Sequence, residues 1–296
     1  MTQPTVFQAH SSYVIDLAFT ADSQTLISAG MDSAVKLWAA PDWRPVATWT
    51  AHDKSVNSLA LSPDGDTLAT SSTDATVRLW SVSSGEVLHT LTDRKKTAAR
   101  VCWSGGGAWV GAGWYGGRAT VWTAGGEPVA AIKASQKNLI GVAFCDAAAS
   151  GAALATAGLG GDISLWALPS GEPLAVLSGH ETAVMALVPI DGGRTLVSVG
   201  YEGTCTFWDV ASGQVARSYE LTGSGAQGTR AVTFSPDESR VALSLEARVE
   251  LRSSADWSLL SELPVSTAVI YGCAFSPDGR WLAGGAADGK IRVWDL

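Results

Sequence analysis

A histidine, a serine or threonine, an aspartate and a tryptophan recur together in this sequence at fixed spacing. The two complete sets are His10, Ser28, Asp32 and Trp38, and His52, Thr70, Asp74 and Trp80. In both sets the Asp follows the His by 22 residues and the Trp follows the Asp by 6. Serine, histidine and aspartate are the residue types of a hydrolytic triad. Because the group is repeated along the chain, the pattern favours a structural role over an active site.

A second pattern, Gly111-Ala112-Gly113-Trp114-Tyr115-Gly116, has the letters of a dinucleotide-binding G-x-G-x-x-G motif. That motif must open a helix whose N-terminus meets the pyrophosphate. Here the strand-like segment 119–122 follows instead. We therefore interpret the match as accidental.

The cysteines offer no metal-binding pattern. Cys102, Cys145, Cys205 and Cys273 are far apart, and none has the spacing of a C-x-x-C motif. Cysteine often packs as a small apolar side chain. We expect four free thiols, most of them buried, with no metal and no cofactor.

The elements that would hold these residues form a repeat. Between His52 and Trp80, two short apolar runs flank the turn Ser62-Pro63-Asp64-Gly65, and a third run ends at Trp80. No segment is long enough for a crossover helix, so the unit is an antiparallel meander. Units of this kind end, 42 or 44 residues apart, at Trp38, Trp80, Trp122, Trp166, Trp208, Arg252 and Trp294.

With the His, the turn and the Trp in register, residues 1–296 resemble the WD-repeat (WD40) family of β-propellers. The resemblance implies one all-β domain of seven blades, each a four-stranded antiparallel sheet, around a central axis. The last unit lacks a fourth strand, because the chain stops at Asp295-Leu296. Residues 4–8 look like the fourth strand that precedes His52. We expect this N-terminal strand to complete the last blade and close the ring.

In this family the four recurring residues form a buried hydrogen-bonded network, which is stable only when every member is present. The resemblance assigns that role to both complete sets and, in repeat 5, to His180, Ser198 and Trp208. Glu202 fills the Asp position of repeat 5, and its longer side chain predicts a disturbed network. Repeats 3, 4, 6 and 7 lack the His, so we expect mainly apolar packing there. Arg252 makes repeat 6 the most degenerate. We interpret it as a weak seam, the alternative being a site remodelled for a partner.

Partner contacts in this family tend to come from the top face, built by the loops that enter each first strand and those that join the second and third strands. Three positions per blade are involved: the third and fifth residues after the His, and the residue before the Asp. Four of the five tyrosines fall on them, and tyrosine and arginine are frequent at binding hot spots. The partner-binding candidates are Tyr13, Met31, Asn57, Tyr115, Met185, Tyr201, Arg230 and Tyr271. The same positions hold Ile15, Ser55, Thr73, Asn138, Ile140 and Val269. The alternative is that these side chains only line the channel mouth.

Charge is uneven between the two expected faces. The net charge of −8 disfavours a nucleic-acid binder, whose affinity depends on neutralising phosphates. The loops that enter first strands carry the cations Lys54, Arg94, Lys95, Lys96, Lys133 and Lys137. The opposite turns carry the acids Asp22, Asp64, Asp66, Asp237, Glu238 and Asp278. A mildly basic, tyrosine-bearing top face would suit an acidic or phosphorylated peptide.

The expected function is a non-catalytic scaffold that binds a partner protein or peptide on the top face. Such a scaffold would act as a monomeric propeller within a larger complex. Two alternatives stay open: an enzyme with an active site in the central channel, and a nucleic-acid reader that uses the basic top-face loops. No apolar run is long enough to span a bilayer, and residues 1–10 lack the basic and apolar regions of a secretory signal. We therefore expect a cytoplasmic protein with no membrane partner.

Overall fold

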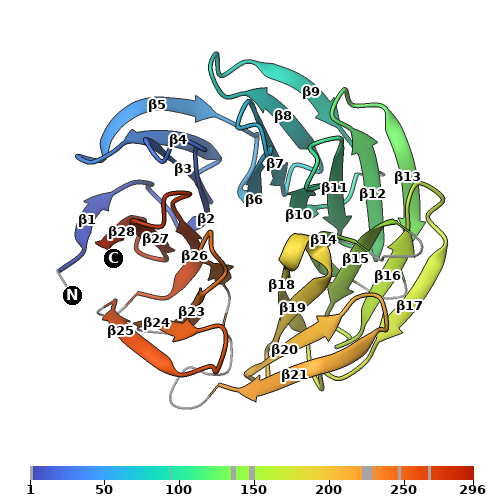
Figure 1. Cartoon of the computed structure of the whole chain (residues 1–296). Helices are drawn as coiled ribbons and strands as arrows, with labels where there is room; N and C mark the ends of the chain where they lie inside the picture. The colour runs from blue at the N-terminus through green and yellow to red at the C-terminus, as the bar shows by residue number, and fades with distance from the viewer. Residues whose placement is uncertain are drawn as a thin grey trace.

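The strands form seven four-stranded antiparallel sheets arranged as the blades of a ring (Figure 1). The computed structural model describes residues 3–93, 95–134, 138–146, 151–221, 229, 231–245, 248–265 and 268–296. Within these residues the other regular element is a short 3-10 turn, η2 (Asp191–Gly193). The all-β, seven-bladed propeller predicted from the sequence is confirmed.

The strands of a blade run outward from the channel in chain order. Blade 1 contains β2 (Val14–Phe19), β3 (Thr25–Gly30), β4 (Ala34–Ala39) and β5 (Arg44–Thr50). Blade 2 contains β6 (Val56–Leu61), β7 (Thr67–Ser72), β8 (Val77–Ser81) and β9 (Val87–Leu91). Blade 3 contains β10 (Ala98–Trp103), β11 (Trp109–Trp114), β12 (Arg118–Thr123) and β13 (Pro128–Lys133). Blade 4 contains β14 (Leu139–Asp146), β15 (Ala152–Gly158), β16 (Ile163–Ala167) and β17 (Pro173–Leu177).

The second half of the ring repeats this order. Blade 5 contains β18 (Val184–Ile190), β19 (Thr195–Gly200), β20 (Thr204–Asp209) and β21 (Gln214–Glu220). Blade 6 contains β22 (Val232–Phe234), β23 (Arg240–Leu245), β24 (Arg248–Ser253) and β25 (Leu259–Pro264). Blade 7 contains β26 (Ile270–Phe275), β27 (Trp281–Ala286), β28 (Lys290–Asp295) and β1 (Thr5–Gln8).

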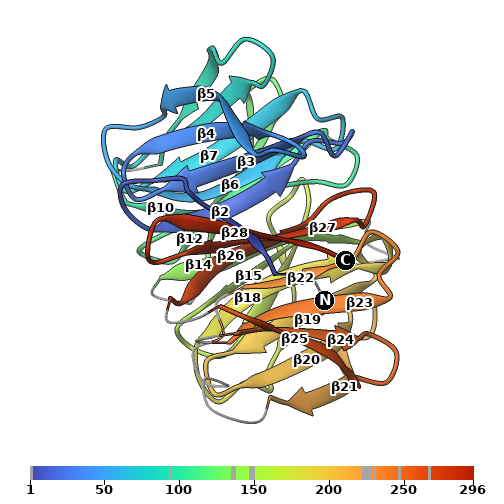
Figure 2. The same cartoon turned by 90° about the vertical axis from the view of Figure 1, so that its left-hand side faces the viewer.

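The N-terminal strand closes the ring, as the sequence predicts. Strand β1 pairs antiparallel with β28, from Thr5 opposite Val293 to Gln8 opposite Lys290. Beyond the strand, the Gly289 carbonyl oxygen accepts hydrogen bonds from two successive backbone N–H groups, each 2.9 Å long. Both ends of the chain therefore lie at blade 7 (Figures 1 and 2). Innermost strand β26 also packs against β2, so the circle of blades is complete.

The apolar core lies between neighbouring blades. In one cluster the buried Trp208 of blade 5 packs with Leu165 and Leu177 of blade 4. In another, Trp38 of blade 1 packs with Ile291 of blade 7. Each blade thus buries one face of its sheet against the next, and this packing holds the inner strands around the channel at fixed positions.

The Ser-Pro-Asp-Gly turn joins first and second strands as the sequence predicts. Between β6 and β7 the Gly65 N–H donates to the Ser62 carbonyl oxygen at 2.9 Å. Gly65 has a φ of +81°, a conformation that favours glycine. The Ser62 hydroxyl donates to the Asp64 carboxylate inside the turn. These turns therefore occupy the face opposite the loops that enter the first strands.

A β-bulge recurs in the innermost strands and matters for the channel. In β2 the pairing register shifts between Val14 and Asp16, which leaves Ile15 without a residue directly opposite. The same shift occurs in β6, β10, β14, β18 and β26. A bulge changes the direction in which side chains point. The bulged residues are Ile15, Asn57, Ala99, Ile140, Met185 and Tyr271.

Candidate functional site

The four recurring residues of blade 1 are in hydrogen-bond contact. His10 Nδ1 lies 2.8 Å from Asp32 Oδ1, and His10 Nε2 lies 2.8 Å from the Ser28 hydroxyl. Trp38 Nε1 donates to the same hydroxyl at 2.9 Å. One tautomer satisfies all four groups: His10 donates from Nδ1 to the carboxylate and accepts from Ser28 at Nε2. Burial lowers the pKa of His10, which favours this neutral ring.

Blade 2 repeats the network with Thr70 in place of serine. His52 lies 2.9 Å from Asp74 Oδ2 and 2.8 Å from the Thr70 hydroxyl, which accepts from Trp80 Nε1 at 2.9 Å. Burial also lowers the pKa of His52. Ser28 and Thr70 are both fully buried, so solvent does not reach either hydroxyl. The geometry of both arrangements is that of a structural clamp between strands.

The network of blade 5 is intact, which overturns the expectation that Glu202 would disturb it. His180 contacts both Glu202 and the Ser198 hydroxyl, and Trp208 Nε1 donates to that hydroxyl at 2.7 Å. The longer side chain folds back over Gly200, where a Cβ atom would overlap the carboxylate. Burial opposes ionisation, yet hydrogen bonds from Thr182, Thr204 and His180 lower the pKa of Glu202 to about 2.

Blade 3 has a polar contact of its own, so mainly apolar packing was too simple an expectation there. Trp114 occupies the register position that Gly30 holds in blade 1. A Cβ atom at Gly30 would overlap the His10 ring, so the Trp114 side chain lies in the region that the imidazole fills in blade 1. Trp114 is fully buried, and its Nε1 donates to Thr120 Oγ1 at 2.7 Å.

Blades 4 and 6 also depart from purely apolar packing. In blade 4, Trp166 Nε1 donates to Thr156 Oγ1 at 2.8 Å. In blade 6, Glu250 is 2% exposed and lies between two guanidinium groups, those of Arg248 and Arg252, each 2.8 Å away. Buried ion pairs are weak evidence for stability, so the weak seam stays a prediction.

Blade 7 lacks the hydroxyl altogether. Gly284 takes the register position of Ser28, and the Trp294 ring lies close to the space that a Cβ atom would fill. Within the described part of the chain, the buried Trp294 Nε1 has no hydrogen-bond partner. Blade 7 also buries an ion pair, since Arg292 is 5% exposed and lies 2.7 Å from Asp288.

Seven residues at the predicted top-face positions line one cavity of about 210 Å³ at the channel mouth. We call this cavity the mouth. Its nine lining residues are Ile15, Met31, Asn57, Ala99, Arg100, Tyr115, Ile140, Met185 and Tyr271. The bulges bring six of them inward, from blades 1, 2, 3, 4, 5 and 7. Five of the partner-binding candidates therefore share one concave surface.

The other three candidates lie elsewhere. Tyr13 does not line the mouth, but its ring stacks on Tyr271, with the ring centres 5.4 Å apart. Tyr201 is 47% exposed and lies outside the lining of the mouth. Arg230 lies outside the described residues.

Hydrogen bonds hold the polar side chains around the mouth in place. Asn57 Nδ2 donates to the Ala98 carbonyl oxygen at 2.8 Å, and Asn57 Oδ1 accepts from Thr73 Oγ1 at 3.2 Å. Asn138 Oδ1 accepts from the Gly116 N–H at 3.1 Å. The rim of the mouth is thus fixed before any partner arrives, which lowers the entropic cost of binding.

A second cavity, of about 350 Å³, lies in the central channel and shares Arg100 and Tyr271 with the mouth. Sequence reasoning missed its polar residues. Simple strand alternation turns the residue after the bulge away from the channel, whereas the bulge lets two successive residues face it. The residues at this second position are Asp16, Ser58, Arg100, Gly141, Ala186 and Gly272. In blade 6, Ala231 also lines the cavity.

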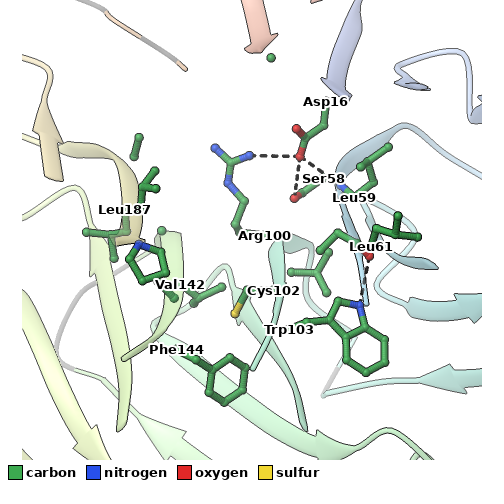
Figure 3. A pocket seen from close by; sticks show the side chains of 18 of the residues that line it. Asp16, Ser58, Leu59, Leu61, Arg100, Cys102, Trp103, Val142, Phe144 and Leu187 are labelled. Carbon is green, nitrogen blue, oxygen red and sulfur yellow. Dashed lines mark hydrogen bonds and ion pairs between the residues drawn. The ribbon is translucent and has the colours of Figure 1, made fainter. Parts of the chain in front are cut away.

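The two charged side chains of the channel lining, Asp16 and Arg100, come from blades 1 and 3, with Ser58 of blade 2 between them (Figure 3). Asp16 Oδ2 accepts from the Ser58 hydroxyl at 3.0 Å and from the Leu59 N–H at 3.1 Å. Asp16 Oδ1 accepts from the Leu17 N–H at 3.0 Å. Arg100 Nη1 lies 3.5 Å from Asp16 Oδ2, a long contact across two blades. On blades 4 to 7 the cavity is lined at this level by glycine and alanine, namely Gly141, Ala186, Ala231 and Gly272.

Exposed lysines lie on the top face at blades 2 and 3. Lys54, Lys95, Lys96 and Lys133 are exposed, whereas Arg94 and Lys137 lie outside the described residues. One nearby acid, Asp93, is paired with Arg118 at 2.6 Å. On the opposite face, hydroxyl groups within the turns stabilise the carboxylates, and bonds from Ser235 and Ser239 lower the pKa of Asp237 to about 2.

The remaining expectations concern metals, thiols and membranes. Among the described residues, no group of three or more His, Cys, Asp or Glu side chains could hold a metal ion. All four cysteines are free thiols; two are buried and two half-buried. Burial raises the pKa of each thiol. In the part of the chain described, no helix has the length and apolar character needed to cross a membrane.

Several curated proteins are similar to parts of this chain. The target of rapamycin complex subunit wat1 of Schizosaccharomyces pombe is 34% identical over 106 residues, which are 34% of this chain and 32% of wat1. Eukaryotic translation initiation factor 3 subunit I of Mycosarcoma maydis is 28% identical over 148 residues, 45% of this chain and 41% of that protein. Small ribosomal subunit protein RACK1 of Medicago sativa is 27% identical over 138 residues, 40% of this chain and 41% of RACK1. The matched segments thus span less than half of each relative.

A family model provides the broader match. The model of the WD domain, G-beta repeat (WD40) matches residues 1–39, 43–81, 171–209 and 257–295, which together make up more than half of the chain. The four segments fall in repeats 1, 2, 5 and 7 of the seven-bladed ring. The chain therefore belongs to the WD40 repeat family.

Proposed function

We propose that this chain is a non-catalytic platform that binds a partner protein or peptide through the mouth and the adjoining top face. One observation carries the proposal: residues from six blades converge on a preformed concave surface that is apolar, aromatic and partly exposed. Met31 and Tyr115 are 41% and 42% exposed. A concave surface with aromatic and methionine side chains is typical of binding sites for protein segments.

The relatives add support of a coarser kind. By their names, wat1 is a subunit of the target of rapamycin complex and RACK1 is a protein of the small ribosomal subunit. Both are components of larger assemblies. We propose by analogy that this chain also works within a protein complex, as one propeller, and that its compartment is the cytoplasm.

The rival functions receive less support. A channel enzyme would need several free acid, base or nucleophilic groups facing one another. In the described channel the carboxylate of Asp16 already accepts hydrogen bonds from the protein. A nucleic-acid reader would depend on the top-face lysines, against a net charge of −8.

The test begins with partner capture from a lysate of the native organism, followed by calorimetric titration of the purified partner. The test variant is Tyr115→Ala/Met185→Ala/Tyr271→Ala, which removes three walls of the mouth. A matched control, Leu88→Ala/Val176→Ala/Leu260→Ala, removes exposed apolar side chains from the outer strands β9, β17 and β25.

We expect the mouth variant to weaken partner binding by a factor of ten or more, because truncating a hot-spot side chain typically costs more than about 1 kcal/mol. The outer-strand control should bind like the wild type, and all three proteins should melt alike. If only the control loses the partner, the binding site lies on the blade rims. Binding of nucleic acid that weakens steeply with salt would favour the reader instead.

A further inference from the structure

We propose that Arg100 is the specificity-determining residue of the mouth and that it pairs with a carboxylate of the bound segment. This inference rests on the proposed function and names the chemistry of its ligand. The partner would present an acidic side chain, or its own C-terminal carboxylate, to the centre of the ring. Apolar side chains around the mouth would contact the rest of the segment.

Arg100 lies where a ligand in the mouth would meet its guanidinium group. Its side chain lines both the mouth and the channel cavity below it. It is 29% exposed, so solvent and a ligand can reach the guanidinium. Among the described residues that line the mouth, Arg100 is the one with a charged side chain. A ligand entering from the top face therefore meets a single positive charge at the floor of an otherwise neutral cavity.

Asp16 receives its shorter hydrogen bonds from residues other than Arg100. Ser58, Leu59 and Leu17 already donate to this carboxylate at 3.0–3.1 Å, whereas Arg100 approaches it no closer than 3.5 Å. Asp16 is therefore stabilised without the guanidinium. Arg100 has five N–H donors, and the contact with Asp16 uses one on Nη1. Its remaining donors are available for the two oxygens of a ligand carboxylate.

The two sides of the channel differ in the size and polarity of their side chains. Blades 1 to 3 contribute Asp16, Ser58 and Arg100, and blades 4 to 7 contribute only glycine or alanine at the same level. The Arg100 side chain thus faces a space that its own protein leaves unfilled (Figure 3). Ile140 and Met185 line the adjoining mouth and add apolar surface beside Arg100. A charge pair formed there is screened less than one on an open surface.

The nearby carboxylate also selects between anions. A phosphate group carries close to two negative charges at neutral pH, and Asp16 would repel it more strongly than it repels a single carboxylate. The geometry at the centre of the mouth therefore favours a carboxylate. A phosphorylated residue would fit better at the lysine-rich edge of the top face, which carries several positive charges.

The experiment uses a displayed library of short random peptides, selected on the full chain. Selected peptides are synthesised with a free and with an amidated C-terminus, and each Glu or Asp is replaced in turn by Gln or Asn. Affinities are measured for the wild type, Arg100→Gln, Arg100→Lys, Asp16→Asn and the control Arg280→Gln. Arg280 is a surface arginine of blade 7 on the opposite face, paired with Asp295.

We expect one carboxylate of the peptide to be essential and Arg100→Gln to weaken binding about tenfold or more. The losses in binding free energy caused by Arg100→Gln and by the peptide substitution should not be additive, because both changes remove the same contact. Arg100→Lys should recover part of the affinity, since lysine keeps the charge but not the fork of donors. Asp16→Asn should tighten binding, because it removes the competing charge. The control should not change it.

The peptide variants and the protein variants distinguish failure of the Arg100 proposal from failure of the proposed function. Loss of binding on amidation assigns the C-terminal carboxylate, and loss on one Glu→Gln change assigns a side chain. Peptides that require Tyr271 but no carboxylate, or that require a lysine or arginine, overturn the role of Arg100 and leave the proposed function standing. If no selected peptide depends on Tyr271, the proposed function itself fails. Should Arg100→Gln lower the melting temperature, the opposite effects of Asp16→Asn and the peptide substitutions still decide the question.

Discussion

The ring of Phe7 packs against the ring of Trp38, with 4.9 Å between their centres. Phe7 belongs to the strand that completes blade 7, and Trp38 belongs to blade 1. This contact therefore spans the point at which the first and last parts of the chain meet. The ladder between β1 and β28 supplies the hydrogen bonds of the closure, and Phe7 supplies apolar contact.

We expect Phe7→Ala to lower the free energy of unfolding by about 1–2 kcal/mol. This is less than the ~3–5 kcal/mol for a fully buried phenylalanine, because Phe7 is half-buried. Deleting residues 1–9 should lower the melting temperature of the whole ring, since it removes an entire strand. Denaturant unfolding followed by circular dichroism measures both effects. The neighbouring exposed Val6→Ala serves as the control, and an unchanged melting temperature in the deletion would show that the closure contributes nothing.

The stability of the protein should fall as the pH drops below about 6.5, the usual pKa of histidine. Burial holds the pKa of His10 and of His52 below the usual value of 6.5. A group of this kind stabilises the folded state above its unfolded pKa, and this contribution is lost as the pH falls through the folded pKa. Urea unfolding at a series of pH values gives the profile. His10→Asn/His52→Asn should flatten it, whereas His89→Asn, in outer strand β9, should leave its shape unchanged.

Trp114→Phe should destabilise the protein by about 1–3 kcal/mol, because it leaves the buried Thr120 hydroxyl without its indole donor. A double-mutant cycle with Thr120→Val isolates this contact, since valine removes the acceptor and keeps the shape. We expect the effect of Trp114→Phe to shrink when Thr120 is already valine. Strictly additive losses would mean that only the size of the indole matters.

Glu202→Gln should lower stability at neutral pH and change the acid limb of the profile. Hydrogen bonds from Thr182, Thr204 and His180 depress the pKa of Glu202 to about 2 from the usual 4.5, although burial acts in the opposite direction. Its contribution to stability is therefore complete above pH 4.5 and is lost as the pH falls toward 2. The difference between the wild type and Glu202→Gln should narrow over that range. A difference that is constant with pH would exclude a role for the charge.

Most of the fold could be predicted from the repeat period. The contacts of side chains that stand in for the recurring His, Ser or Thr, Asp and Trp could not. The number of blades and the closing strand follow from the period and from the resemblance of residues 4–8 to a fourth strand. In blade 3, Trp114 fills the region that the His10 imidazole occupies in blade 1. That contact depends on which face of β11 the indole points to, and the sequence does not show it. Likewise, the sequence showed that Glu202 is one methylene longer than Asp, and only the structure shows the room above Gly200.

The mouth was predicted better than the channel. Met185 and Tyr271 were identified because each is the fifth residue after the His position. In both inner strands this fifth residue is the bulged one. Arg100 follows directly after a bulge, where period-two alternation turns a side chain away from the channel. Tyr201 has the predicted position and is exposed but does not line the mouth, so its role in partner binding stays a prediction.

The affinity for the captured partner should fall as salt concentration rises, because exposed lysines lie on the top-face loops of blades 2 and 3 and salt screens them. Lys54→Gln/Lys95→Gln/Lys96→Gln should reduce both the affinity at low salt and its salt dependence. Arg44→Gln/Arg194→Gln/Arg280→Gln removes the same charge from the opposite face and provides the control. Calorimetric titration between about 50 and 300 mM salt, over which the Debye length shortens markedly, measures the slope. An affinity that does not change with salt would rule out the acidic ligand at the rim, and equal slopes in both variants would mean that only the net charge of the protein acts.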